Sequence, residues 1–254
     1  MRPPPAELAI VRRFEAAGFR AWPAETAQYD GTWLLRLDSG HAAKRLNSVN
    51  PLDPGDATQA AARVERAAQR FTEAHRPLTF RMSPLGGDTL EEHFDREGWS
   101  RFGHSIVMRR ALDEDVVADA LDQIPLKDGR RFTAALARVQ GARPDAARGL
   151  QTIIERVPAE AGLFLIERDG IPLAGTVCVH DGELAGLFEV ATHQSVRGQG
   201  FGRRIALSAL KWARGRGARQ AWLQVEADNA VALGLYGSLG FGELYRYSYR
   251  RPPA

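Results

Sequence analysis

The sequence is poor in several features that would assign it to particular protein classes. Of its 254 residues only Cys178 is a cysteine, which excludes intramolecular disulfides and a cysteine-rich metal site. No apolar run approaches the ~18 residues that span a bilayer. The first residues, MRPPPAELAIVRRFE, contain no apolar signal-peptide core. We therefore expect a cytoplasmic protein without a membrane partner.

Basic side chains are also not concentrated. The formal net charge is +3, and lysine occurs only at positions 44, 127 and 211. The arginine-rich stretches RRFEAAGFR and RGRGAR are short and more typical of solvated helix faces than of a nucleic-acid surface, so no nucleic-acid partner is expected. The 6 histidines lack HxxxH or HxH spacing, and no metal is expected. With 44% hydrophobic and 26% charged residues, the chain has the composition of a globular protein.

The second half has the pattern of an α+β domain. Apolar spacing and turn signals such as Asp169-Gly170 and Asp181-Gly182 define its elements. In chain order we predict a helix over 146–157, strands over 163–168, 172–180 and 184–191, a helix from 203 to about Gly215 or Gly217, a strand over 221–227, a helix over 229–239 and a strand over 245–249.

The first half repeats this pattern at an offset of 142 residues. Ser39-Gly40 meets Asp181-Gly182, a strand over 77–82 meets 219–224, a helix over 57–74 meets the helix after residue 202, and 94–110 meets 236–252. We interpret this as an internal duplication; the alternative is two unrelated α+β halves. The predicted units are 1–112 and 130–254, joined by an acidic linker over 113–129, and each is a mixed, mostly antiparallel sheet flanked by helices.

A glycine-rich loop, Arg197-Gly198-Gln199-Gly200-Phe201-Gly202, lies between a predicted strand and a predicted helix. Glycines allow the backbone to approach an anion closely, and the free N–H groups of the following helix turn point at it. Nearby arginines add positive charge. The loop therefore favours a phosphate or pyrophosphate ligand, and the alternative is a tight structural turn.

From Leu184 to Phe241 the sequence resembles the GNAT superfamily of N-acetyltransferases. Its pyrophosphate loop follows the pattern Arg/Gln-x-x-Gly-x-Gly/Ala, met here by Arg197, Gly200 and Gly202, and LQVEADNAVALGLYGSLGF (223–241) is similar to the family's second signature. The resemblance covers about 145–250. Because the first half is covered through the repeat, the whole chain resembles a tandem GNAT protein.

The resemblance implies an acetyl-CoA-dependent N-acetyltransferase whose acceptor is a small-molecule or peptide amine. The alternative is a non-catalytic acyl-CoA sensor or scaffold. Tyr236 would protonate the departing thiolate, unless it is only a half-buried aromatic. The implied cofactor-binding residues are Val190, Ala191 and Thr192 along the pantetheine arm, Arg197, Gly198, Gln199, Gly200, Phe201, Gly202 and Arg203 around the pyrophosphate, and Asn229 at the next helix.

Acetyl transfer to an amine also requires a group that takes a proton. Many relatives that acetylate protein N-termini have a Glu five residues before the Asn, where this sequence has Gln224, which cannot act as a base. Glu226, on the same strand face, and Glu189, on the central strand, are the two candidate bases. Each could instead be a surface carboxylate paired with an arginine, and a water relay could replace both.

The first half departs from the family pattern. Asp56-Ala57-Thr58-Gln59-Ala60 replaces the glycine loop, and Phe94 replaces Tyr236. Side chains would crowd a phosphate and Asp56 would repel it, so we expect a degenerate copy without cofactor. The polar stretch KRLNSVNPL (44–52) matches the active-site strand end. Either it helps to wall the acceptor site, or Arg45 and Asn47 are ordinary strand-end polar residues.

Overall fold

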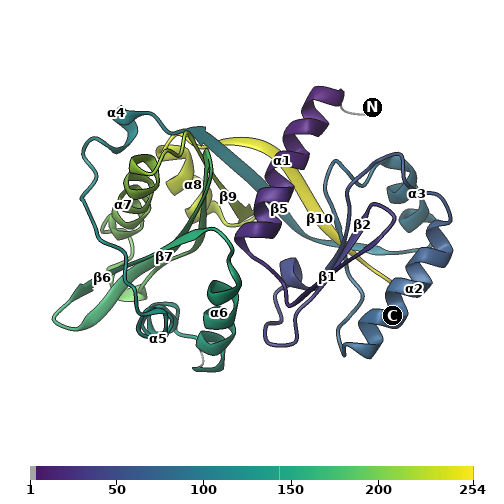
Figure 1. Ribbon diagram of the computed structural model, residues 1–254, viewed down its shortest axis with the longest axis horizontal. Coiled ribbons are helices and arrows are strands. Elements are labelled where there is room, and N and C mark those ends of the chain that lie inside the picture. The colour runs from purple at the N-terminus through teal and green to yellow at the C-terminus, as the bar shows by residue number, and fades with distance from the viewer. Residues whose placement is uncertain (1–3, 143, 254) are drawn as a thin grey trace.

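The computed structural model describes residues 4–142 and 144–253, whose strands form one mixed sheet flanked by helices (Figure 1). The strands are β1 (Thr26–Asp30), β2 (Trp33–Leu37), β3 (Ser48–Pro51), β4 (Phe80–Met82), β5 (Ser100–Ala111), β6 (Glu160–Arg168), β7 (Ile171–Asp181), β8 (Leu184–Thr192), β9 (Gln220–Glu226) and β10 (Gly242–Arg251). The helices are α1 (Pro5–Ala21), α2 (Ala60–Glu73), α3 (Asp88–Arg96), α4 (Glu114–Val117), α5 (Gly129–Gln140), α6 (Pro144–Arg156), α7 (Phe201–Gly215) and α8 (Ala230–Ser238).

The two halves have the same strand order. From each outer edge toward the centre, β1-β2-β3-β4 matches β6-β7-β8-β9, and in both sets the first two pairings are antiparallel and the third is parallel. The bounds of α3 and α8 coincide under the offset of 142 residues. The predicted repeat therefore corresponds to a repeat of topology.

The last strand of each half pairs with the other half. β10 lies beside β4, β5 lies beside β9, and β5 and β10 pair with each other at the centre of the sheet. Figure 1 shows these two long strands running through the middle of the molecule. We propose 1–112 and 130–254 as the boundaries of the two copies of the duplicated unit. Because β5 and β10 each pair with a strand of the other unit, an arrangement that we call the strand exchange, the two units form one sheet.

Apolar side chains form three clusters around the sheet. In the second half, α7 and α8 bury one face of β6–β9, while α1, α5 and α6 cover the other face. In the first half, α2 and α3 pack on β2, β3 and β4 around Trp33, Phe80 and Phe94. Among the described helices, none combines the length and apolar character needed to cross a membrane.

The structure also corrects several sequence predictions. α5 was not predicted. It begins at Gly129, the last residue assigned to the linker, and continues into the second unit, and Asp128 caps it by accepting a hydrogen bond from the Arg131 N–H. The stretch 44–46 is a short 3-10 helix, so only 48–51 of the predicted polar strand is β3. The predicted strands of the second half exist. β9 is shifted by one residue from the prediction, and the other four are longer than predicted, since long-range pairing extends them beyond their apolar centres.

A buried ion pair connects α1 to the centre of the sheet. The Glu15 carboxylate bonds the Arg81 guanidinium, and it also accepts a hydrogen bond of 2.6 Å from the Tyr245 hydroxyl. Glu15 and Arg81 are only 3% and 4% exposed. Tyr245 lies on β10, so this cluster joins the first-half helix to the exchanged strand.

Replacing Glu15 by Gln should destabilise the fold strongly. The Arg81 charge would then remain buried without its partner, which typically costs about 3–5 kcal/mol. We expect a clear fall in the free energy of unfolding measured by urea denaturation. Glu183→Gln is the matched control. Glu183 pairs at 2.9 Å with Arg13, which lies on α1 like Glu15, but both side chains of this pair are exposed. Exposed ion pairs contribute little to stability. Equal effects of the two substitutions would contradict the assignment.

Candidate active site

A gap opens between the two parallel strands at the centre of the second half. β8 and β9 pair only from Leu184 to Leu187 and from Gln220 to Leu223. Beyond Leu187, β8 continues beside β7, while β9 continues beside β5. A bulge adds to the separation, because Glu189 and Val190 both lie opposite Thr176, and Glu189 has a φ of +53°. The β8 edge over residues 188–192 therefore faces the gap without a strand partner in the described chain.

The glycine loop places free N–H groups beside this gap. Gly200 caps α7 in the left-handed region at a φ of +80°, and a Cβ built there would meet nothing within 4 Å. The first hydrogen bond of the helix runs from the Arg204 N–H to the Gly200 carbonyl, so the N–H groups of residues 201–203 precede it. No acidic residue lies in this first turn, and Arg197, Arg203 and Arg204 are exposed around it. The geometry suits a phosphate.

α8 forms the opposite wall of the gap. Asn229 caps this helix by accepting a hydrogen bond of 3.0 Å from the Ala232 N–H. Tyr236 is 7% exposed and packs edge-on against Phe241. Its hydroxyl has no hydrogen-bond partner within the described residues. Burial raises the pKa of Tyr236 to about 12, so the side chain is protonated at neutral pH.

These elements enclose a groove of about 690 Å³. Of the predicted cofactor residues, Val190, Ala191, Thr192, Arg197, Gly198, Gly200, Phe201, Gly202, Arg203 and Asn229 line it, together with Tyr236. Gln199 does not line it, and its side chain instead donates a hydrogen bond to the Ser195 carbonyl at 3.4 Å. Its lining residues include both Tyr236 on α8 and the residues at the N-terminus of α7.

Glu189 and Glu226 line a second, smaller pocket of about 310 Å³ on the other side of β8 and β9. Its walls come from both halves of the chain. The first half contributes His41, Ala43, Lys44, Arg45 and Ser105, and the second half contributes Gln224, Val225, Tyr247 and Tyr249 beside the two glutamates. Two residues of the stretch KRLNSVNPL, Lys44 and Arg45, thus lie at this pocket.

The two carboxylates differ in their surroundings. Glu189 bonds Arg45 Nη2 at 2.5 Å through Oε1 and Gln140 Nε2 at 3.0 Å through Oε2. Among the described residues, the Glu226 carboxylate forms one ion pair, with Lys44 Nζ at 3.6 Å, and its side chain is 64% exposed. Because Gln140 also lines the larger groove, Glu189 lies at the boundary between the two cavities.

The corresponding loop of the first half is closed by its own carboxylate. Asp56 accepts hydrogen bonds from the Thr32 N–H at 2.9 Å, the Thr32 hydroxyl at 2.8 Å and Arg63 Nη1 at 2.9 Å. The bond from the Thr32 backbone lowers the pKa of Asp56 and keeps it charged. Gln59 replaces the capping glycine in the left-handed region, with a φ of +55°. These contacts tie the loop to the β1–β2 hairpin.

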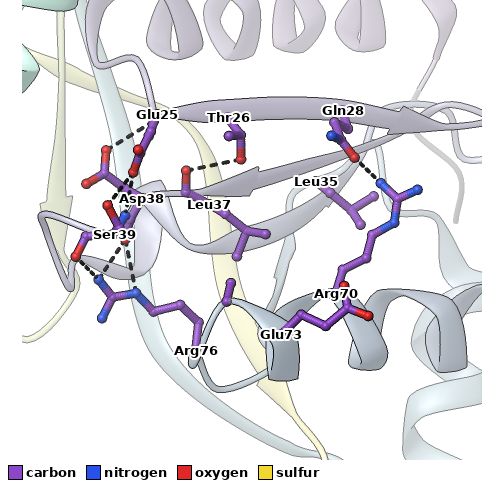
Figure 2. A pocket seen from close by; sticks show the side chains of 11 residues that line it. Glu25, Thr26, Gln28, Leu35, Leu37, Asp38, Ser39, Arg70, Glu73 and Arg76 are labelled. Atoms are coloured by element: carbon purple, nitrogen blue, oxygen red, sulfur yellow. Dashed lines mark hydrogen bonds between the residues drawn. The ribbon is translucent and has the colours of Figure 1, made fainter.

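The first half contains a different pocket, of about 580 Å³, between the β1–β2 hairpin and the end of α2. Figure 2 shows Arg70 beside Gln28 and Arg76 beside Asp38 and Ser39 along its walls. Under the offset of 142, Arg70 corresponds to Trp212, which packs against Phe164 in the second half.

A sheet split between two parallel strands, with a glycine loop capping a helix at the split, defines a GNAT-type N-acetyltransferase. Residues 8–250 match the family model described as "Probable histone acetyltransferase Rv0428c C-terminal", and the chain belongs to this family. It is an acyltransferase with the α+β tandem GNAT fold predicted from the sequence.

Three known proteins illustrate the relationship. The uncharacterized N-acetyltransferase YobR of Bacillus subtilis is 26% identical over 94% of this chain and 98% of its own length. A mycothiol acetyltransferase of Thermomonospora curvata is 34% identical over 62% of this chain and 58% of its own. A solved tandem GNAT protein from the clavulanic acid biosynthesis pathway has a TM-score of 0.64, with 16% identity over 98% of this chain and 88% of that one, and shows the shared fold.

Several residues of the two cavities were not predicted. Val139 and Gln140 come from α5, and Tyr247 and Tyr249 come from the exchanged strand. His41 also lines the smaller pocket, and burial lowers its pKa, so its ring is neutral at neutral pH. No local motif marks these positions. The amphipathic pattern of 129–140 was the one available signal, since it would have revealed the helix that carries Gln140.

Proposed function

We propose that this protein transfers an acetyl group from acetyl-CoA to a primary amine by direct attack within a ternary complex. The observation that supports this most is the continuous groove from the N-terminus of α7 to Tyr236. Acetyl-CoA would supply an acyl group activated as a thioester. The α7 N–H groups and the surrounding arginines bind the pyrophosphate, and the β8 edge over residues 190–192 pairs with the pantetheine amides.

Tyr236 acts at the thioester end of the groove. Its hydroxyl stays protonated and free to donate to the developing thiolate. A thiol has a pKa of ~8.5 in water, whereas the pKa of Tyr236 is about 12. The Tyr236 hydroxyl therefore donates a hydrogen bond to the leaving sulfur in the transition state and keeps its proton. A proton lost by the attacking amine finally neutralises the thiolate.

Glu226 is the better placed of the two candidate bases. Both oxygens of Glu189 accept hydrogen bonds, from Arg45 and Gln140, so Glu189 holds these two side chains in place at the pocket. The Glu226 carboxylate has no direct hydrogen bond in the described chain. Glu226 accepts the proton of the incoming ammonium directly or through water. The acceptor enters through the smaller pocket and meets the thioester at the boundary between the two cavities.

Release of CoA with a panel of amines tests the proposed function. Ellman's reagent can follow the released thiol directly, because the one cysteine of the chain, Cys178, is fully buried and its burial raises the thiol pKa. We expect acetyl-CoA turnover that depends on at least one amine. Binding of acetyl-CoA without turnover for any amine would favour the acyl-CoA sensor over the enzyme.

Glu226→Gln should separate the two carboxylates. The substitution keeps shape and removes the base, so kcat should fall and the loss should be greatest on the acidic side of the pH–rate profile, where the amine arrives protonated. Glu189→Gln should mainly raise the acceptor KM, because a neutral amide bonds Arg45 and Gln140 more weakly than the carboxylate does and so holds the pocket wall less firmly. If the pH profile of Glu226→Gln matches the wild type, water or another group takes the proton.

A further inference from the structure

The smaller pocket contains balanced charges that are only partly satisfied. It holds two cations, Lys44 and Arg45, and two anions, Glu189 and Glu226. His41 adds no charge because its pKa is lowered by burial. The lining residues therefore sum to zero formal charge, with the cations on the first half of the chain and the anions on the second.

Aromatic rings as well as the carboxylates hold the two cations in place. The Arg45 guanidinium lies 4.7 Å from the centre of the Trp22 ring and 5.8 Å from that of Phe188. Lys44 Nζ lies 5.3 Å from the centre of the Tyr249 ring and 5.6 Å from that of Phe102. Such stacking fixes the position of a cation while leaving its N–H groups available.

Each charged group keeps hydrogen-bonding capacity for a ligand, and this includes Glu189, because each of its oxygens accepts one hydrogen bond and can accept a second. Within the described residues only Nη2 of Arg45 has a hydrogen bond, so its remaining N–H groups are free. Lys44 Nζ and Glu226 are 3.6 Å apart, which is longer than a hydrogen bond, so neither is fully satisfied by the other. A ligand that offers one negative and one positive group can bond all four.

Resting on the proposed acetyltransferase function, we propose that the acceptor is a free α-amino acid with an uncharged side chain. Its carboxylate binds between Arg45 and Lys44, and its ammonium binds between Glu189 and Glu226. The amine nitrogen then attacks the thioester carbonyl, the carbon–sulfur bond breaks, the amine's surplus protons pass to Glu226 and to the thiolate, and the products are the N-acetyl amino acid and CoA.

Other amine classes fit the pocket less well. A polyamine or a lysine-rich peptide adds positive charge beside Lys44 and Arg45 with no carboxylate to meet them. The N-terminus of a peptide offers an ammonium next to a neutral carbonyl, which leaves both cations unpaired. The volume of about 310 Å³ is at the lower end of the ~300–1,000 Å³ of small-molecule sites, which also favours a small acceptor.

The test compares amino acids with the amines that lack only the carboxylate. Phenylalanine with phenethylamine and leucine with isopentylamine are suitable pairs, together with leucinamide and a lysine-rich peptide. CoA release gives kcat and KM, and saturation-transfer NMR with CoA present gives acceptor binding independently of amine reactivity. We expect the amino acids to bind about 10- to 100-fold more tightly than their partners, as for the loss of a hydrogen bond to a charged group.

Lys44→Met provides the second arm. It keeps the aliphatic chain against Phe102 and Tyr249 and removes the charge. We expect it to lower the preference for the amino acid over its decarboxylated partner, measured as the ratio of the two KM values, about 10-fold or more. Lys127→Met is the control, because Lys127 is exposed and outside both cavities.

The outcomes separate this inference from the proposed function. Turnover with phenethylamine, leucinamide or the peptide at equal or greater efficiency than with amino acids would overturn the amino-acid assignment and leave the acetyltransferase intact. An unchanged preference in Lys44→Met would do the same. Absence of CoA release with every amine would instead contradict the proposed function.

Discussion

Gly200→Glu is expected to abolish acetyl-CoA binding measured by calorimetry. The Cβ position at Gly200 faces open space at the N-terminus of α7, where the pyrophosphate is proposed to lie. A glutamate there would fill that space and place a negative charge against the phosphates. The same titration should give one site per chain for the wild type, because Asp56 closes the equivalent loop of the first half.

Gly170→Glu is the matched control for this substitution. Gly170 also has a positive φ, +75°, and an added Cβ would meet nothing within 4 Å, but it lies in the β6–β7 turn. Both variants force a non-glycine residue into the left-handed region, which costs roughly 1–2 kcal/mol. Only Gly200→Glu should lose the ligand. Unchanged affinity in that variant, or two sites per wild-type chain, would contradict the proposed pyrophosphate site.

Tyr236→Phe is expected to lower kcat by ~10²–10⁴-fold, the usual contribution of a positioned acid. The phenyl ring keeps the packing against Phe241, so acetyl-CoA affinity should be nearly unchanged. Because the pKa of Tyr236 is about 12, its ionisation should not limit the wild-type rate at ordinary assay pH. Single-turnover kinetics would separate the chemical step from binding.

Phe94→Leu serves as the structural control, since Phe94 lies at the equivalent position of the first half and is fully buried there. It should reduce stability through lost packing and leave kcat unchanged. A Tyr236→Phe enzyme that works at the wild-type rate would show that water or the substrate supplies the proton.

The sequence predicted best what depends on local signals. Gly200 and its helix follow from a glycine cluster before an amphipathic stretch, and α8 follows from Asn229 and Gly240 at its two ends. The family resemblance and the repeat both rested on these elements, and the family model bears out the resemblance over residues 8–250.

The features that the sequence did not predict depend on contacts between distant positions. Arg45 and Glu189 are 144 residues apart, and nothing near either residue indicates the other. The bulge at Glu189 follows from its pairing with β7, and Gln140 reaches Glu189 from α5, a helix that was not predicted from the sequence. The exchange of β5 and β10 is likewise not predictable from periodicity. The two strands have similar patterns, so the sequence does not indicate that β10 rather than β5 pairs with β4, or that β5 rather than β10 pairs with β9.

The exchange of β5 and β10 also determines when the protein can be completed during its synthesis. β4 pairs with β3 within the first half, but it gains its second neighbour only when residues 242–251 have been translated, so a nascent chain that ends after the first half exposes an unpaired strand edge. The paired residues of β4 and β10 are 166 to 170 positions apart, so this pairing closes late. A strand made long after the first half therefore completes the sheet of that half, and the smaller pocket gains Tyr247 and Tyr249 when this strand pairs.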